Sequence, residues 1–210
     1  MTKSTRKSFL IKLALTLFAA FLFSLAHPGF INSRGISFFG FVTLIPVFYV
    51  ITDTRARFVW IYGFLFGILD YVLFVYWFIA YAWYFLAVIC FIYGIYNAIT
   101  FVLIRYVYVL LENNRSLTKP LNNFLKENLL NFFTAGSFAA IWVLYEKVKD
   151  SSFLGLSYGL IGYSQWKNLF LLQTASFGGV WFVSFYLAFF SAVCAILIKT
   201  FINLKIPKKM

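Results

Sequence analysis

Long stretches without charge constrain the fold of this chain more than any other feature. The hydrocarbon core of a bilayer, about 30 Å thick, requires roughly 20 apolar residues per helix, and several stretches reach that length. With 63% hydrophobic and 11% charged residues, the sequence cannot be arranged around one water-soluble core. Stretches 58–68 and 72–79 are apolar on every face, without the alternation typical of a β-barrel strand. In lipid such stretches must satisfy their own backbone groups, so we expect an all-α polytopic membrane bundle.

The apolar stretches predict one transmembrane domain that covers residues 1–210. About six spans are expected, at residues 9–26, 36–52, 58–79, 84–111, 130–145 and 169–198. The hydrophilic interval 112–128 is expected to be a cytoplasmic connector. Residues 147–168, here called the outer arm, are apolar enough in part to re-enter the membrane or to lie at its interface.

The net charge of +12 is distributed unevenly between the two sides of the predicted bundle. With six spans, 14 of the 18 Lys and Arg residues fall on the side of the two termini. This asymmetry follows the positive-inside rule and predicts that both termini are cytoplasmic. Topology therefore explains the basic charge, and no nucleic-acid partner is expected.

Asp70 lies in the middle of the third predicted span. An unpaired carboxylate there costs about 2.5–3.5 kcal/mol on insertion scales, so the side chain must face protein or water. Two interpretations stay open, a contact with substrate or lipid headgroup and a structural hydrogen bond to a neighbouring helix.

Trp142 and Glu146 are four residues apart and therefore share one face of the fifth span, at its outer end. They could form part of a site at the outer membrane interface. Alternatively, Trp142 is an aromatic-belt residue beside a solvated acid that pairs with Lys147 or Lys149.

The chain shows no recognisable catalytic constellation, so no catalytic residue, cofactor or metal is predicted. His27 is the only histidine, which excludes a cluster of several histidines, and a loop or helix-end role is expected for it. Cys90 and Cys194 lie within predicted spans, far from a cation that would activate a thiol. No Ser, Cys or Lys has a local partner of the kind that nucleophilic catalysis requires.

An ordered set of polar residues and glycines runs through the second half of the chain. It comprises Trp142, Glu146, Gly155, Gly162, Tyr163, Ser164, Gln165, Gln173, Gly178 and Gly179. Residues 25–30 and 62–67, with the pair Tyr76 and Trp77, add a proline turn and a glycine-spaced helix. In this order the features resemble the membrane half of apolipoprotein N-acyltransferase. One departure is Ser157 and Tyr158, which stand where the family has Pro-Trp.

The resemblance implies a bacterial inner-membrane protein of lipoprotein biosynthesis. In that family an acyl chain passes from a phospholipid to an enzyme cysteine and then to the N-terminal amine of a diacylated lipoprotein. Phospholipid and diacylated lipoprotein are accordingly the implied partners. The candidate binding residues are Trp142, Glu146, Tyr163, Gln165, Asp70 and Trp77.

The family's catalytic residues lie in a soluble hydrolase-like domain and have no counterpart in this sequence. We therefore expect the membrane module of a truncated or split enzyme that is not catalytic alone, with a separately encoded catalytic half as a further partner. The alternative is a non-enzymatic scaffold that binds lipid or lipoprotein. The resemblance and the spacing also predict a polar cluster of Glu146, Tyr163 and Gln165 at the outer side.

Overall fold

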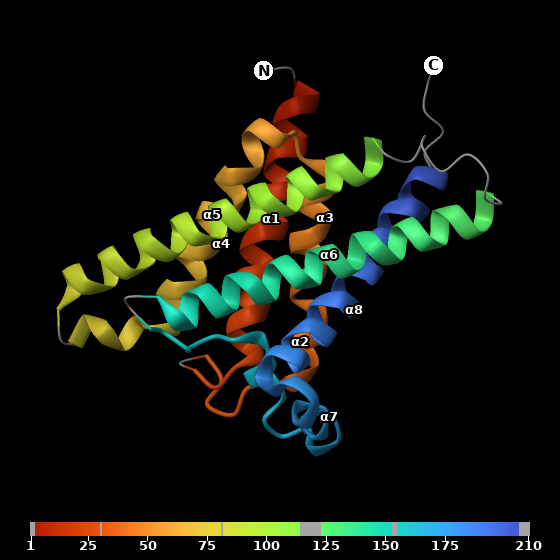
Figure 1. Cartoon of the computed structure of the whole chain (residues 1–210). Helices are drawn as coiled ribbons and strands as arrows, with labels where there is room; N and C mark the ends of the chain where they lie inside the picture. Colours follow the sequence, from red (N-terminus) through yellow and green to blue (C-terminus); the bar gives the residue numbers. More distant parts are fainter. Residues whose placement is uncertain (1–2, 30, 81, 114–122, 153–154, 206–210) are drawn as a thin grey trace.

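The computed structural model describes residues 3–29, 31–80, 82–113, 123–152 and 155–205, which form helices and no strand (Figure 1). The predicted all-α membrane bundle is therefore confirmed. Among the described residues, five helical segments are long and apolar enough to cross a membrane. They centre on α1 (Lys3–Ala26), α4 (Val59–Phe74), α5 (Trp83–Asn113), α6 (Asn123–Ser151) and α8 (Ala175–Lys205).

The second predicted span is a pair of short helices, α2 (Ser37–Val42) and α3 (Leu44–Asp53). Pro46 has no amide hydrogen to donate to the carbonyl of Val42, which explains a break between the two helices. The hydroxyl of Thr43 at the break donates to the carbonyl oxygen of Ala19 at 2.9 Å and so ties it to α1. The pair still runs the length of the bundle (Figure 1).

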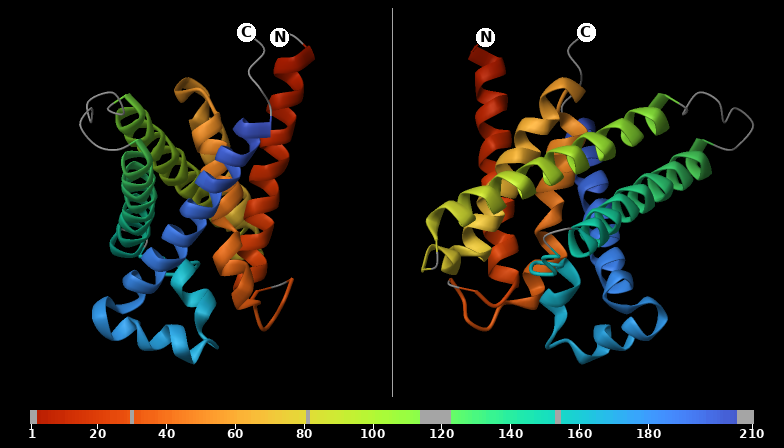
Figure 2. Two further views of the ribbon diagram at one scale, coloured as in Figure 1. Left: turned by 90° about the vertical axis from the view of Figure 1, so that its right-hand side faces the viewer. Right: turned by 60° about the vertical axis from the view of Figure 1, so that its left-hand side comes forward.

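The two ends of the bundle carry different elements. α1 begins and α8 ends at one end, here called the terminal end (Figure 1). The outer arm, α2 and the short helix α7 (Leu169–Gln173) lie at the other, here called the arm end. Figure 2 shows α5 and α6 side by side and inclined to α1.

Two glycines bring α4 into close contact with α5. A Cβ atom on Gly63 would lie 2.7 Å from the carbonyl oxygen of Asn97, and one on Gly67 would lie 2.6 Å from that of Tyr93. Small residues at this spacing let two membrane helices approach closely. α4 and α5 are therefore held as a tightly packed pair.

Several elements differ in length from the predicted spans. α4 ends at Phe74 and gives way to a 3-10 helix, η2 (Tyr76–Ala80). α6 extends into both the predicted connector and the first five residues of the outer arm. Residues 114–122, the middle of the predicted connector, lie outside the described residues.

The last helix is bent near its start. Gly179 has φ 65° and ψ −160°, a conformation that glycine adopts readily and that other residues rarely do. Gly178 beside it is also non-helical, so the regular part of α8 begins after the glycine pair. The predicted sixth span, 169–198, thus contains α7, the bend and most of α8.

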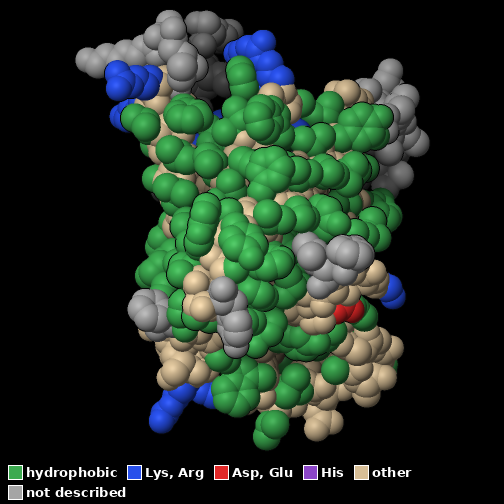
Figure 3. Space-filling model, turned by 90° about the vertical axis from the view of Figure 1, so that its left-hand side faces the viewer, with side chains coloured by type: hydrophobic (Ala, Val, Ile, Leu, Met, Phe, Trp, Pro, Cys, Tyr) green, Lys and Arg blue, Asp and Glu red, His purple; other side chains and the backbone are tan. Residues whose placement is uncertain are grey.

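The surface pattern fits a protein surrounded by lipid. Figure 3 shows one face on which hydrophobic side chains form a broad band. Lys and Arg side chains gather at the terminal end of that face, and fewer lie at the arm end.

Candidate functional site

The arm end contains ionisable side chains that are almost entirely buried. Glu146 is 0% exposed, Lys149 1% and Asp70 4%. Glu146 and Lys149 are three residues apart on α6, so they share a face with Trp142, and α4 brings Asp70 toward them. Buried charges need partners, and the partners here belong to the outer arm.

Glu146 holds the backbone of the outer arm. Its Oε1 accepts hydrogen bonds from the indole Nε1 of Trp142 at 3.1 Å and from the amide of Ile161 at 2.7 Å. The next amide, that of Gly162, donates to the hydroxyl of Ser184 on α8 at 3.1 Å. α6 and α8 thereby position the 3-10 helix η4 (Ile161–Gln165). The interpretation of Glu146 as a solvated acid is wrong, because the side chain is fully buried.

Lys149 holds the preceding part of the arm. Its Nζ donates to the carbonyl oxygens of Tyr158 and Gly159, each at 3.0 Å. The ammonium also lies 5.8 Å from the ring centre of Tyr71 and 5.5 Å from that of Tyr145, within cation–π range. It interacts electrostatically with both Glu146 and Asp70. Lys149 thus binds the arm backbone and places a positive charge near two buried carboxyl groups.

His27, at the end of α1, makes a third connection to the arm. Its Nδ1 lies 3.0 Å from the carbonyl oxygen of Phe23, and its Nε2 lies 2.9 Å from that of Leu160. Burial lowers the pKa of His27, although both carbonyl contacts act in the opposite direction. A neutral imidazole carries one N–H, so it can donate to only one of the two carbonyls at a time.

Gln165 fixes the far end of η4 to α2. Its Nε2 donates to the carbonyl oxygen of Ser37 at 2.8 Å and to the hydroxyl of Ser164 at 2.9 Å. Gly40 makes room for this contact, since a Cβ atom there would lie 2.7 Å from Nε2 of Gln165. Four helices, α1, α2, α6 and α8, therefore hold one short segment of the arm.

The predicted association of Glu146 with Tyr163 and Gln165 takes a different form. Glu146 is bonded to the arm backbone at Ile161, whereas the amide of Gln165 is bonded to α2. Tyr163 is 47% exposed. Among the hydrogen bonds of the described residues, none joins Glu146 to either side chain.

Exposed aromatic side chains mark the surface of the same region. Trp77, Tyr158, Tyr163 and Trp166 are each between 38% and 56% exposed. The rings of Trp77 and Tyr158 lie 6.4 Å apart, so η2 and the arm contribute to one surface. Aromatic residues of this kind are suited to the boundary between lipid and water.

The interior beside the arm also contains polar atoms with unused hydrogen-bonding capacity. Asp70 Oδ1, Asn97 Oδ1 and Glu146 Oε2 are buried without a hydrogen-bond partner among the described residues. Within those residues, no group of three or more His, Cys, Asp or Glu side chains could hold a metal ion. Such unpaired buried atoms are unusual in proteins and can interact with a polar ligand.

Sequence reasoning identified Asp70, Trp142 and Glu146 but missed two residues that hold the arm. The sequence names Lys149 only as one of two possible partners of a solvated acid, although its spacing from Glu146 places both on one helix face. His27 was expected at a helix end, where it lies, but its contact with Leu160 is 133 residues away in sequence. No local pattern could have indicated that contact.

Comparison of the sequence with known proteins identifies the family. The sequence matches the family model described as the apolipoprotein N-acyltransferase N-terminal domain over residues 10–193. The chain belongs to this family. It is therefore a bacterial inner-membrane protein, in agreement with its apolar helices.

Two Treponema proteins named apolipoprotein N-acyltransferase 1 are similar to this chain. The protein from Treponema denticola is 32% identical over 191 residues, which cover 89% of this chain and 31% of that protein. The protein from Treponema pallidum is 54% identical over 44 residues, 21% of this chain and 8% of that protein. The chain thus spans about a third of the length of the first relative, and no solved structure matches it.

Proposed function

We propose that the chain is a membrane module for N-acyl transfer from phospholipid to lipoprotein, and that it contributes lipid binding rather than the nucleophile. The observation that carries the proposal is the outer arm, which buried side chains hold from four helices while Tyr158, Tyr163 and Trp166 stay exposed. A fixed backbone with an exposed aromatic surface is suited to guiding acyl chains at the membrane interface.

The acyl chains are proposed to lie against Trp77, Tyr163 and Trp166. The lipoprotein and the phospholipid share this part of the membrane, so one surface could receive both. Among the described residues, neither cysteine hydrogen-bonds to a base, and Cys90 is only 5% exposed. A thioester-forming cysteine needs an activated thiolate, which supports assigning the nucleophile to another polypeptide segment.

Photo-crosslinking tests the lipid contact directly. A benzoylphenylalanine at position 163 or 166 is expected to label a radioactive diacylated lipopeptide in proteoliposomes. The matched control replaces Trp60, which is 49% exposed but lies near the terminal end. Equal labelling at all three positions would contradict a specific surface at the arm.

An acyl-transfer assay tests whether the chain lacks the nucleophile. The purified chain with phospholipid and diacylated lipopeptide is expected to show no transfer above empty membranes. Adding the part of the Treponema denticola relative that this chain does not match is expected to restore transfer if the chain is an enzyme module. Turnover by the chain alone would place a nucleophile within it. Lipopeptide binding without turnover in either case would favour the scaffold alternative.

The proposed orientation places both termini in the cytoplasm and the outer arm on the opposite side. The distribution of Lys and Arg supports it. Reporter fusions at residues 1 and 210 are expected to give cytoplasmic signals, and a fusion in the arm an external one. An external signal at residue 210 would require an odd number of crossings.

A further inference from the structure

A cavity of about 780 Å³ lies at the terminal end, between the beginnings of α1 and α4. The 3-10 helix η1 (Ala56–Phe58) contributes to its wall. Four cationic residues line it, namely Arg6, Lys12, Arg55 and Arg57, together with one acidic residue, Asp53. Its volume is within the range of about 300–1,000 Å³ that small-molecule sites occupy.

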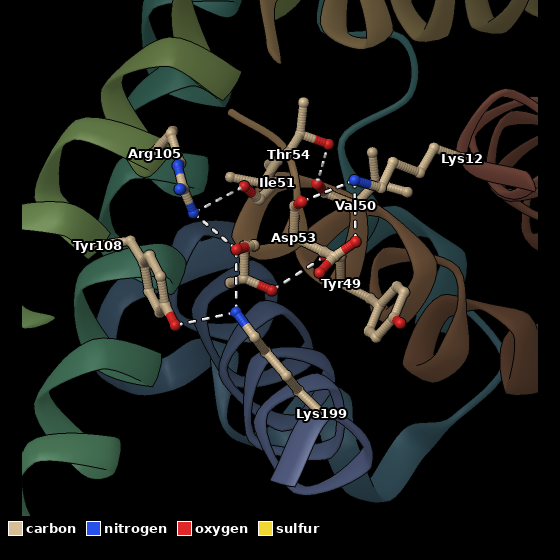
Figure 4. A network of polar contacts seen from close by, with 10 residues as sticks. Lys12, Tyr49, Val50, Ile51, Asp53, Thr54, Arg105, Tyr108 and Lys199 are labelled. Carbon is tan, nitrogen blue, oxygen red and sulfur yellow. Dashed lines mark hydrogen bonds and ion pairs between the residues drawn. The ribbon is translucent and has the colours of Figure 1, made fainter. Parts of the chain in front are cut away.

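One of these cations already has a structural role. Lys12 Nζ lies 2.8 Å from the carboxylate of Asp53 and donates to the backbone carbonyl of the same residue at 2.6 Å. Figure 4 shows that this contact belongs to a wider network at the C-terminal end of α3. The network also includes Arg105 of α5 and Lys199 of α8, both of which donate to the carbonyl oxygen of Thr52. Cations at this position satisfy the unpaired carbonyls of a helix end.

The three arginines in the cavity have no such role. Arg6, Arg55 and Arg57 are exposed, and in the described part of the chain none has a carboxylate within 4 Å. The guanidinium carbon of Arg57 lies 4.7 Å from the ring centre of Phe58, which keeps the charge beside an apolar wall. With Lys12 and Asp53 paired, the cavity retains three positive charges that have no carboxylate counterion among the described residues.

Apolar side chains complete the cavity. Phe9, Leu10, Phe58 and Ile61 line it together with the arginines. Leu10 is 52% exposed and Phe58 44%, although both belong to segments long and apolar enough to cross a membrane. A ligand that fits must therefore carry negative charge and hydrocarbon in one molecule.

We propose that this cavity binds one anionic phospholipid from the leaflet at the terminal end. Its phosphate would contact Arg6, Arg55 and Arg57, and an acyl chain would lie along Phe9, Leu10 and Phe58. A basic pocket between membrane helices is a recognised way to select acidic lipid headgroups. Arginine is suited to this role because its guanidinium can form two parallel hydrogen bonds with a phosphate.

Trp60 provides a reporter for the experiment, since its Nε1 donates to the carbonyl of Arg57 at 3.1 Å and the side chain is exposed. The full chain is placed in phosphatidylcholine nanodiscs with one-fifth of the lipid brominated, either phosphatidylglycerol or phosphatidylcholine. The signal of Trp60 is obtained by subtracting the fluorescence of a Trp60→Phe variant from that of the natural chain. The quenching of that signal by brominated phosphatidylglycerol is expected to be at least roughly twice the quenching by brominated phosphatidylcholine.

Two triple variants separate the cavity from general charge. Arg6→Gln/Arg55→Gln/Arg57→Gln is expected to abolish the preference, whereas Lys in the same three positions is expected to retain most of it. The control at the same end, Lys7→Gln, removes an exposed positive charge of α1 outside the cavity lining and should leave the preference intact.

Three outcomes would overturn the proposal. The first is equal quenching by the two brominated lipids. The second is loss of the preference in Lys7→Gln as well as in the Gln triple variant, which would indicate unspecific attraction to an acidic membrane. The third is reversal of the quenching by inorganic phosphate at constant ionic strength, which would identify a site for free phosphate instead of a lipid site.

Discussion

The arm end and the terminal end both contain basic side chains that bind backbone carbonyls, but the two ends use their charges differently. At the arm end, Lys149 is buried and its ammonium interacts electrostatically with Glu146 and Asp70. At the terminal end, Lys12 fixes a helix end while Arg55 and Arg57 beside it stay exposed. Buried charges stabilise the folded structure, because removing one of them leaves its partners unpaired. Exposed charges beside an apolar wall remain accessible to a ligand from outside the protein.

The largest loss of stability is expected from Lys149→Met at the arm end. The substitution removes the donor to two arm carbonyls and leaves Glu146 and Asp70 without their cation. Leaving two buried carbonyl oxygens without their donor typically costs about 1–3 kcal/mol for each group, or about 2–6 kcal/mol in all. The free energy of unfolding in mixed detergent micelles is expected to fall by that amount.

The control for this variant is Lys147→Met on the same helix. Lys147 is exposed and lies 5.8 Å from the ring centre of Trp181, so its loss is expected to cost less than about 1 kcal/mol. Glu146→Gln keeps an oxygen for Trp142 and Ile161, and combined with Lys149→Met it is expected to cost less than the sum of the two changes. Equal effects of Lys149→Met and Lys147→Met would show that the buried ammonium does not hold the arm.

The comparison also shows which parts of the molecule the sequence could predict. Runs of apolar residues are local, so they correctly indicated an all-helical bundle in a membrane. The break in the second span depends on Pro46, which is a local signal in the sequence. Its consequence, a hydroxyl of Thr43 directed to α1, depends on packing and could not be read from the chain.

The site was predictable only in part for the same reason. The shared face of Trp142 and Glu146 follows from helix geometry, and the two side chains are hydrogen-bonded. The burial of Glu146 depends on where the outer arm folds, and that is a long-range property. In the sequence, Lys149 is identifiable only as a possible partner of a solvated acid, because the carbonyls that surround its ammonium are brought there by the fold.

A smaller effect is expected from the contact between α2 and the arm. In Gly40→Ala the new methyl group would meet Ser164 and Gln165, and such overpacking typically costs about 1–3 kcal/mol. Gly136→Ala on α6 is the matched control, since nothing lies within 4 Å of its Cβ position. That change is expected to be neutral or to stabilise by up to about 1 kcal/mol. Limited proteolysis should show faster cleavage of the arm in the first variant alone.

The same pair tests whether the arm is important for lipid binding. Gly40→Ala is expected to reduce lipopeptide crosslinking at position 166 while leaving quenching of Trp60 by phosphatidylglycerol unchanged. Loss of both signals would mean that the two ends of the bundle are coupled. Retention of both would show that the contact with Gln165 is not needed to position the arm.

The smallest effect concerns the pH dependence of His27. Because burial lowers its pKa in the folded protein, the unfolded chain takes up a proton at a higher pH than the folded one. The contribution of His27 to stability is therefore fully present above pH of about 6.5 and declines as the pH falls toward the lowered value. The decline cannot exceed about 1.4 kcal/mol for each pH unit.

Other groups also titrate between pH 7 and 5, so the relevant quantity is a difference between two proteins. His27→Gln retains a donor for one of the two carbonyls that the imidazole contacts and cannot titrate. The unfolding temperature of the natural chain is expected to fall more steeply with decreasing pH than that of the variant. The opposite result, a natural chain that gains stability over the variant as the pH falls, would mean that the two carbonyls hold an imidazolium. His27 would then resemble Lys149, as a second buried cation binding the backbone of the outer arm.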